Sequence, residues 1–303
     1  MKYVLAGASG FLGKALARDL VAEGHQVLRL VRRTPSMPEE IRWDPARGDL
    51  DPSALGDPDV LVNLAGANIG RPWTPTYRLK IRESRVDTTA TLAAAATQLD
   101  RRPVLITQSG IGGYGTDLGD RILTEDSDLG DGFLADVVRL WEGALEPARA
   151  AGSRVAALRT GVVLDRAAPA FQLLTLPFRL GLGGRLGSGT QYFPVVSLTD
   201  WTRAVRHVAE TEAVNGPVNI ALPTPATNSE FTEALATALH RPSAIPIPAT
   251  VMKLALGEFA WELLGSKRAL PTRLQSTGFT FHHPTVATAL SAALAGSHVA
   301  GHR

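Results

Sequence analysis

Two spacings of apolar residues alternate along the first half of the chain. Residues 4–6 form a continuous apolar run typical of a buried strand, and residues 11–21 then place apolar side chains at helical spacing until Gly24. The predicted strands cover residues 4–6, 25–31, 40–43, 59–66, 103–110 and 153–164, and the predicted helices cover residues 11–21, 76–99 and 133–151. Such alternation predicts an α/β protein with a doubly wound parallel sheet.

The pattern changes after Leu164. Residues 177–196 carry closely spaced glycines and prolines, which are typical of loops lying over a sheet. Helices are predicted at residues 198–211, from Asn228 as the capping residue to about His240, and at residues 250–264, with an extended link at residues 241–249. We therefore expect a sheet domain at residues 1–165, to which residues around 195–222 return, a smaller, mainly helical C-terminal lobe at residues 166–295, and a frayed tail at residues 296–303.

Composition limits the classes of function. The 303 residues carry a formal charge of only +2, which gives no strong electrostatic case for binding nucleic acid or an anionic membrane. The chain has no cysteine, so disulfides, thiolate metal sites and a cysteine nucleophile are excluded. We see neither a leader sequence nor an apolar run of the roughly 18 residues that a membrane span needs. We expect a cytoplasmic monomer or homodimer acting on a small molecule.

Three glycines follow the first strand at the spacing of a nucleotide-binding loop. Gly7 permits a tight turn, Gly10 lets the backbone approach a pyrophosphate, and Gly13 allows close packing of the helix on the strand. The start of the helix presents free N–H groups and the positive end of its dipole. This context indicates a dinucleotide site, and a purely structural turn is the alternative.

The end of the second strand bears on the choice of dinucleotide. An NAD site usually has a carboxylate there, but this strand ends at Arg32 and Arg33. A charge-assisted hydrogen bond to a 2′-phosphate is worth roughly 1.5–3 kcal/mol, or about 10- to 150-fold in favour of NADP. Arg32 is the first choice for this role, with solvated charges as the alternative. Asp44, after the next strand, is a candidate for the adenine amino group or for a turn.

Other polar residues give weaker signals. Arg78, Arg82 and Arg85 share one predicted helix face, and they either reach phosphates of a cofactor or anionic substrate or face solvent; Arg85 is our candidate for the cofactor. Asp200 opens a predicted helix, where a carboxylate interacts with the dipole. His282 and His283 are adjacent on an extended segment and point opposite ways, so we expect no metal site.

Longer motifs indicate a family. They are NLAGANIGRPWTPTYRLKIRESRVDTT (63–89), TQSGIGGYG (107–115), RTGVVLD (159–165), PFRLGLGGRLGSGTQYF (177–193), GPVNIALPTPATNSEF (216–231) and LHRPSAIPIPA (239–249). Together with the glycine loop, they make the chain resemble the extended short-chain dehydrogenase/reductase superfamily. Within it, the chain is similar to sugar-nucleotide-epimerase-like proteins of the NAD-dependent epimerase/dehydratase family that carry a C-terminal domain of unknown function. The resemblance covers nearly the whole chain and implies a Rossmann-type fold that binds NADP(H).

The same resemblance implies roles for individual residues. Residues implied to contact the cofactor are Gly7, Ser9, Gly10, Phe11, Leu12 and Gly13 at the pyrophosphate, Arg32 at the 2′-phosphate, and Leu64, Ala65 and Gly66 at the adenine-ribose edge. Ser109 falls on the superfamily's catalytic serine, which hydrogen-bonds a substrate carbonyl or hydroxyl; the alternative is a serine that merely ends a strand. Gln191 and Tyr192 fall where extended members bind substrate, with loop closure as the alternative.

The chain departs from the superfamily at its Tyr-x-x-x-Lys pair, whose positions hold Leu134 and Val138. A phenol without a neighbouring cation has a pKa near 10, so only about one part in a thousand is ionised at pH 7. Tyr114, five residues beyond Ser109, is the nearest replacement and can donate a proton without ionising first. Packing over the cofactor is its alternative role.

Whether the chain is an enzyme therefore stays open. The favoured hypothesis is hydride transfer between NADP(H) and a small carbonyl or sugar-nucleotide-like substrate, with Ser109 orienting the oxygen and Tyr114 or a water supplying the proton. The main alternative is a protein that senses NADP(H) without turnover, because the Tyr-x-x-x-Lys pair is absent. A scaffold with a vestigial cleft is the third hypothesis.

Overall fold

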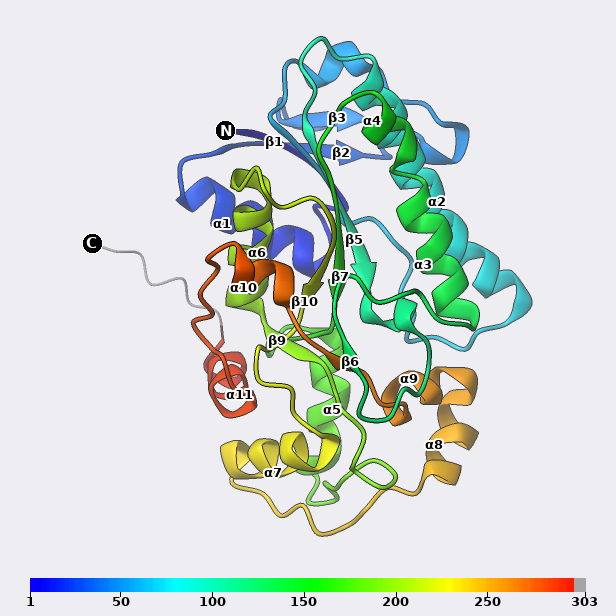
Figure 1. Cartoon of the computed structure of the whole chain (residues 1–303), viewed down its shortest axis with the longest axis vertical. Helices are drawn as coiled ribbons and strands as arrows, with labels where there is room; N and C mark the ends of the chain where they lie inside the picture. Colours follow the sequence, from blue (N-terminus) through cyan, green and yellow to red (C-terminus); the bar gives the residue numbers. More distant parts are fainter. Residues whose placement is uncertain (297–303) are drawn as a thin grey trace.

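A seven-stranded parallel sheet forms the centre of the computed structural model, which describes residues 1–296 apart from the side chain of Ala255 (Figure 1). The strand order is β3-β2-β1-β4-β5-β7-β10. The strands are β1 (Lys2–Ala6), β2 (Gln26–Val31), β3 (Glu40–Arg42), β4 (Val60–Asn63), β5 (Val104–Gly110), β7 (Val155–Thr160) and β10 (Gly216–Ile220). The order reverses between β1 and β4, and parallel α/β sheets bind ligands at the carboxyl ends of the strands at such a point. The predicted Rossmann-type class is confirmed.

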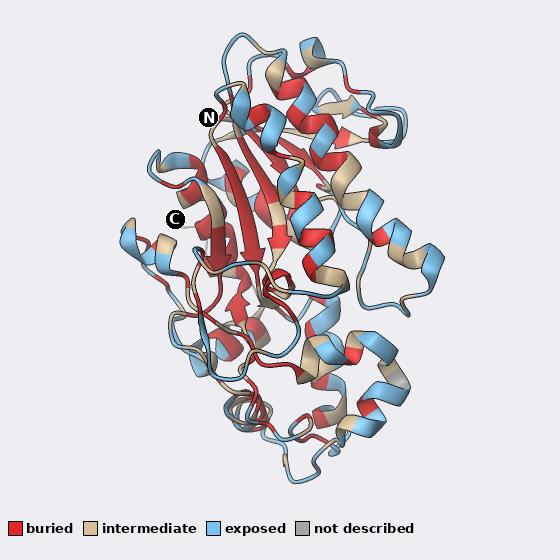
Figure 2. Cartoon of the chain, turned by 45° about the vertical axis from the view of Figure 1, so that its right-hand side comes forward, coloured by how far each residue is buried: buried red, intermediate tan, exposed pale blue. Residues whose placement is uncertain are grey.

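Helices cover both faces of this sheet. One face packs against α1 (Phe11–Ala22) and α6 (Leu198–Glu210), and the other against α2 (Pro75–Thr97) and α4 (Glu146–Ala150), with α3 (Phe133–Gly143) beside α2. Figure 2 shows buried strands between helices whose outer surfaces are exposed. In β1, Tyr3 and Leu5 enter one core while Val4 and Ala6 enter the other, so the apolar run is buried on both sides.

The C-terminal lobe is mainly helical, and two short two-stranded sheets link it to segments of the sheet domain. Its helices are α5 (Pro169–Arg179), α7 (Asn228–Leu239), α8 (Ala249–Leu256), α9 (Ala260–Leu264), α10 (Thr272–Ser276) and α11 (Val286–Ala295). The short sheets pair β8 (Val162–Leu164) with β9 (Val195–Ser197), and β6 (Ile122–Leu123) with β11 (Arg268–Ala269). No helix within the described residues is long and apolar enough to cross a membrane. Beyond Gly296, the predicted tail lies outside the described residues.

Three predicted elements are each divided in two. The predicted helix at residues 133–151 is interrupted between α3 and α4, where Pro147 stands in the first turn of the second helix. The predicted strand at 153–164 is split at Gly161, where the chain passes from the central sheet to the short sheet with β9. A Cβ atom on Gly161 would lie 2.5 Å from the carbonyl oxygen of Pro194, so this crossing requires glycine. The predicted helix at 250–264 is split at Gly257, whose φ of +58° ends α8.

Two features of the C-terminal lobe differ from the prediction. Helix α5 was missed, and the loop predicted at residues 177–196 begins within the last turn of that helix, at Pro177. The capping residue of α7 is Thr227, which forms a capping box with Glu230. Asn228 is instead buried, and its side-chain oxygen accepts a hydrogen bond from the Leu186 N–H at 2.7 Å.

Candidate cofactor and active site

The glycine loop packs tightly between the ends of two strands. Gly7 has a φ of +77°, and a Cβ atom there would lie 2.6 Å from the carbonyl carbon of Leu64. A Cβ atom on Gly13 would overlap the carbonyl oxygen of Gly7. The loop therefore requires glycine at both positions to bring the start of α1 against the ends of β1 and β4.

The first turn of α1 is free to receive an anion. Its capping residue is Gly10, so no side chain satisfies the first N–H groups, and the turn contains no acidic residue. Ser9 and Gly10 are exposed, and Phe11 and Leu12 are half-buried. Unpaired N–H groups and the helix dipole make such a turn a suitable site for a pyrophosphate.

The two arginines after β2 differ in their partners. The Arg33 guanidinium donates to both carboxylate oxygens of Glu40, at 2.8 and 2.5 Å, and these hydrogen bonds, with one from the Ser36 N–H, lower the pKa of Glu40 to about 2. Arg32 is exposed and makes no ion pair with any residue from 1 to 296. This difference supports Arg32 over Arg33 as a ligand for a phosphate.

Asp44 follows β3, at the same carboxyl end of the sheet as Arg32. Its backbone pairs with that of Asp49, and its carboxylate lies 3.6 Å from Arg47. Asp44 begins a short 3-10 helix (Pro45–Arg47), but its side chain makes no capping hydrogen bond. The turn-forming alternative for its carboxylate therefore finds no support in the geometry.

Beyond β4, Leu64 and Ala65 are half-buried and Gly66 is exposed beside the Arg85 side chain, whose Cζ would lie 3.3 Å from a Cβ atom on Gly66. The Arg85 guanidinium donates to the carbonyl oxygens of Ile81 at 2.9 Å and Ala67 at 3.0 Å. Burial lowers its pKa to about 10. No carboxylate within the described chain pairs with it, so a half-buried cation stands next to the end of β4.

The other two arginines of α2 do not join Arg85 in one anion-binding face. Arg78 forms an ion pair with Glu258, and its guanidinium lies over the Phe133 ring at 4.6 Å. Arg82 is exposed and lies 4.0 Å from Glu83. The three arginines thus have helical spacing on α2, but each side chain has different neighbours.

Ser109 belongs to a buried charged network that we did not predict. Its hydroxyl donates to Glu142 Oε1 at 2.8 Å, and Arg159 donates to both oxygens of the same carboxylate at 2.9 and 2.8 Å. The side chains of Arg159 and Glu142 are only 6% and 15% exposed. Burial alone would lower the pKa of Arg159, but the hydrogen bonds and charge of Glu142 outweigh it and raise that pKa.

The network fixes what the Ser109 hydroxyl can do. Its single proton points to Glu142, so towards another molecule the oxygen can only accept a hydrogen bond. Two buried polar atoms, Gln108 Oε1 on the residue before Ser109 and Arg159 Nη1 in the network itself, have no partner within residues 1–296. Such atoms are usually satisfied by water or a ligand.

The contacts of Tyr114 do not suit a proton donor to a substrate. Its side chain is buried, and its hydroxyl contacts Asn219 Oδ1 at 2.7 Å and the Thr124 carbonyl oxygen at 2.9 Å. Burial raises the pKa of the phenol, and Arg159 lies 4.9 Å from the ring centroid. The geometry does not favour Tyr114 as a proton donor, because both acceptors of its hydroxyl belong to the protein; packing over the cofactor stays a prediction.

Leu134 and Val138 do lie beside the segment that follows Ser109. A Cβ atom on Gly112 would be 3.1 Å from Leu134 Cδ1, and one on Gly113 would be 2.6 Å from Val138 Cγ1. The expected positions of the tyrosine and lysine therefore face the carboxyl end of β5, but with apolar side chains.

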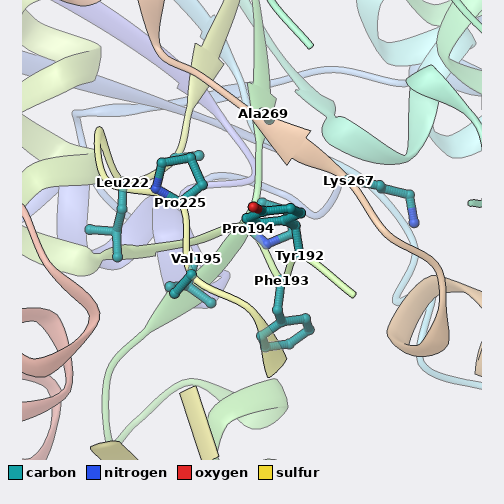
Figure 3. A pocket seen from close by; sticks show the side chains of 10 residues that line it. Tyr192, Phe193, Pro194, Val195, Leu222, Pro225, Lys267 and Ala269 are labelled. Atoms are coloured by element: carbon teal, nitrogen blue, oxygen red, sulfur yellow. The ribbon is translucent and has the colours of Figure 1, made fainter. Parts of the chain in front are cut away.

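The predicted substrate residues Gln191 and Tyr192 lie in a closed loop. Gln191 is buried and donates to the Leu186 carbonyl oxygen at 2.9 Å, which supports the loop-closure alternative. Tyr192 lies with Pro194 and Lys267 around a cavity of about 10 Å³ (Figure 3). This volume is about that of one water molecule.

Asp200 has a structural role in binding the C-terminal segment to α6. Its carboxylate is fully buried and accepts hydrogen bonds from the backbone N–H groups of His282 and His283, both at 2.8 Å. It also lies 3.1 Å from Arg203. The His282–His283 pair is therefore attached to the first turn of α6 through its backbone.

Fold and loop together define a Rossmann-type α/β protein with a nucleotide-binding loop at the switch point of its sheet. Residues 3–130 match the NAD dependent epimerase/dehydratase family, and residues 247–293 match a domain of unknown function, DUF1731. The chain belongs to this epimerase family, as its identity to curated relatives over nearly its whole length shows.

Two relatives and one solved structure illustrate the similarity. The epimerase family protein ML0860 of Mycobacterium leprae is 42% identical over 95% of this chain and 94% of its own length. The human epimerase family protein SDR39U1 is 39% identical over 96% of this chain and 98% of its own. The crystal structure of human SDR39U1 (isoform 2) with NADPH has a TM-score of 0.86 and 34% identity, and covers 96% of this chain and 98% of that one.

Proposed function

We propose that this protein is an NADP(H)-dependent oxidoreductase acting on a small carbonyl compound or the corresponding alcohol. The observation that carries the proposal is the pairing of an uncapped glycine loop with Arg32, a strand-end cation that has no carboxylate partner in the described chain. The human relative that was crystallised with NADPH supports the choice of cofactor.

The residues of the site fit such a cofactor. Gly7, Gly10 and Gly13 leave no side chain between the loop and a pyrophosphate, and the N–H groups of Phe11 and Leu12 are free to bind it. Arg32 would bind the 2′-phosphate. Arg85 would add a positive charge beside Gly66, at the end of β4.

When bound, the nicotinamide supplies or accepts a hydride. In the direction of reduction, the carbonyl carbon gains that hydride and the oxygen gains a proton, so the products are an alcohol and NADP⁺. Ser109 can only accept a hydrogen bond here, so we propose that it holds a water whose second hydrogen points to the substrate oxygen. Water is therefore the proposed proton donor in place of Tyr114, and the hydroxide that it leaves takes up a proton from solvent.

The first test is the preference between NADPH and NADH. We expect wild-type protein to bind NADPH at least about tenfold more tightly than NADH, and Arg32→Ala to remove the preference by weakening only NADPH binding. Nicotinamide fluorescence during titration with each nucleotide measures both constants. Arg33→Ala is the matched control, because Arg33 is already paired with Glu40, and it should keep the preference. Equal binding of both nucleotides by the wild type would contradict the assignment of Arg32.

A second experiment separates the enzyme from the sensor. Apolar side chains at Leu134 and Val138, with the phenol of Tyr114 buried, favour the alternative of a protein that binds NADP(H) without turnover. If the chain is an enzyme, Ser109→Ala should lower kcat for NADPH oxidation by a carbonyl compound about 10²-fold without changing NADPH affinity. Ser109→Thr, which keeps a hydroxyl, should recover much of the rate. Tight NADPH binding with no turnover across a panel of carbonyl compounds would favour the sensor.

A further inference from the structure

A second and larger cavity, of about 260 Å³, opens beside the carboxyl end of β5. Gly112, three residues beyond Ser109, and Leu134, at the position of the missing tyrosine, both line it. Its opposite wall comes from the segment that matches the domain of unknown function, through Glu258, Trp261 and Glu262. Glu262 Oε2 would lie 3.0 Å from a Cβ atom on Gly112, so this segment reaches across to the sheet domain.

Aromatic rings form much of the lining. Trp73 and Phe133 meet edge to face with their centroids 5.0 Å apart, and both contribute to the cavity. Trp261, on α9, is 43% exposed. Faces and edges of such rings favour flat apolar groups, which pack against them in stacked or edge-to-face geometry.

The charges of the lining do not suit a polyanion. One cation, Arg78, stands against the carboxylates of Asp131, Glu258 and Glu262. Arg78 is already paired with Glu258, and Glu262 is paired with Lys267 at 3.2 Å. No unpaired cation within the described residues therefore lines this cavity, whereas diphosphates are usually bound by arginine or lysine side chains.

We propose that this cavity holds the whole substrate, and that the substrate is a small uncharged carbonyl compound with a flat apolar group, or its alcohol. The inference rests on the proposed function for its chemistry. The cavity volume supports a small molecule, because pockets for drug-sized ligands occupy roughly 300–1,000 Å³. The inferred substrate class excludes nucleotide sugars, despite the family to which the chain belongs.

The test compares three probes on the full chain, with and without NADPH, by isothermal titration calorimetry. The probes are acetophenone, para-acetylbenzoate, which differs by one carboxylate, and UDP-glucose. We expect acetophenone to bind at least about tenfold more tightly than para-acetylbenzoate, and UDP-glucose to bind more weakly than either ketone. Tighter binding of UDP-glucose than of acetophenone, or equal binding of the two ketones, overturns the inference.

Two variants with matched controls locate the binding. Trp261→Ala should weaken acetophenone binding about tenfold. The control is Leu254→Ala on α8: the Leu254 side chain is 91% exposed and does not line the cavity, so this variant should bind acetophenone as the wild type does. Asp131→Lys should improve binding of para-acetylbenzoate relative to acetophenone, while Asp100→Lys, in the exposed turn after α2, should not. An unchanged acetophenone affinity in Trp261→Ala also overturns the assignment.

The outcomes keep the two proposals apart. If NADPH does not bind but acetophenone binds in a manner that depends on Trp261, the proposed function fails while the assignment of an apolar ligand to the cavity stands. If NADPH binds with the preference described above and UDP-glucose is the tightest of the three probes, the proposed function stands and the inferred substrate class falls.

Discussion

Replacing Glu142 with glutamine is expected to lower the free energy of unfolding by about 3–5 kcal/mol, the usual cost of leaving one partner of a buried ion pair without the other. Arg159 would keep its charge in a site where its side chain is only 6% exposed. Glutamine has nearly the same shape as glutamate and can still accept from Ser109, so the loss reports the charge rather than packing. Urea denaturation of the two proteins measures the difference.

A surface pair provides the control. Glu146 and Arg149 form an ion pair on α4 with side chains 62% and 48% exposed, and Glu146→Gln should change stability by at most about 1 kcal/mol. The double variant Glu142→Leu with Arg159→Met should be more stable than Glu142→Gln alone, because it removes the unpaired charge together with its partner. A loss below about 1 kcal/mol in Glu142→Gln would show that this network does not hold β7 to α3.

Local patterns were sufficient to predict the sheet and the cofactor loop. The apolar run of β1, the glycine spacing and the helical periodicity of α1 are all properties of neighbouring residues, and a parallel sheet buries its strands on both faces. The arginines after β2 were predictable for the same reason. Which of the two is free depends on Glu40, seven residues from Arg33 and on the next strand, so their spacing alone did not decide between them.

The network of Ser109, Glu142 and Arg159 could not be predicted from spacing. Ser109 and Glu142 are separated by 33 positions, and Glu142 and Arg159 by 17. One signal was available: Arg159 is a charged residue inside an otherwise apolar strand, and a buried charge requires a partner. Tyr114 was proposed as a proton donor from its closeness to Ser109 in the sequence, but its acceptor Asn219 lies 105 positions away.

Replacing Gly13 with alanine is expected to abolish measurable nucleotide binding while destabilising the fold by about 1–3 kcal/mol, the usual cost of one excess methyl group in a packed site. Its Cβ would overlap the Gly7 carbonyl oxygen and lie 2.7 Å from the Ala8 Cα atom. Both neighbours are backbone, so the loop itself must move away from the start of α1. The N–H groups that would bind the pyrophosphate then no longer converge.

Gly143→Ala is the matched control for this change. Gly143 ends α3, and a Cβ atom there meets nothing within 4 Å, so alanine should be neutral or slightly stabilising because it favours the helix over glycine. NADPH titration and thermal unfolding of both variants separate loss of binding from loss of fold. Because the overlap at Gly13 is local, the variant should unfold cooperatively, yet NADPH should not raise its Tm as it would raise that of the wild type. An NADPH-dependent rise in Tm in Gly13→Ala would place the nucleotide away from this loop.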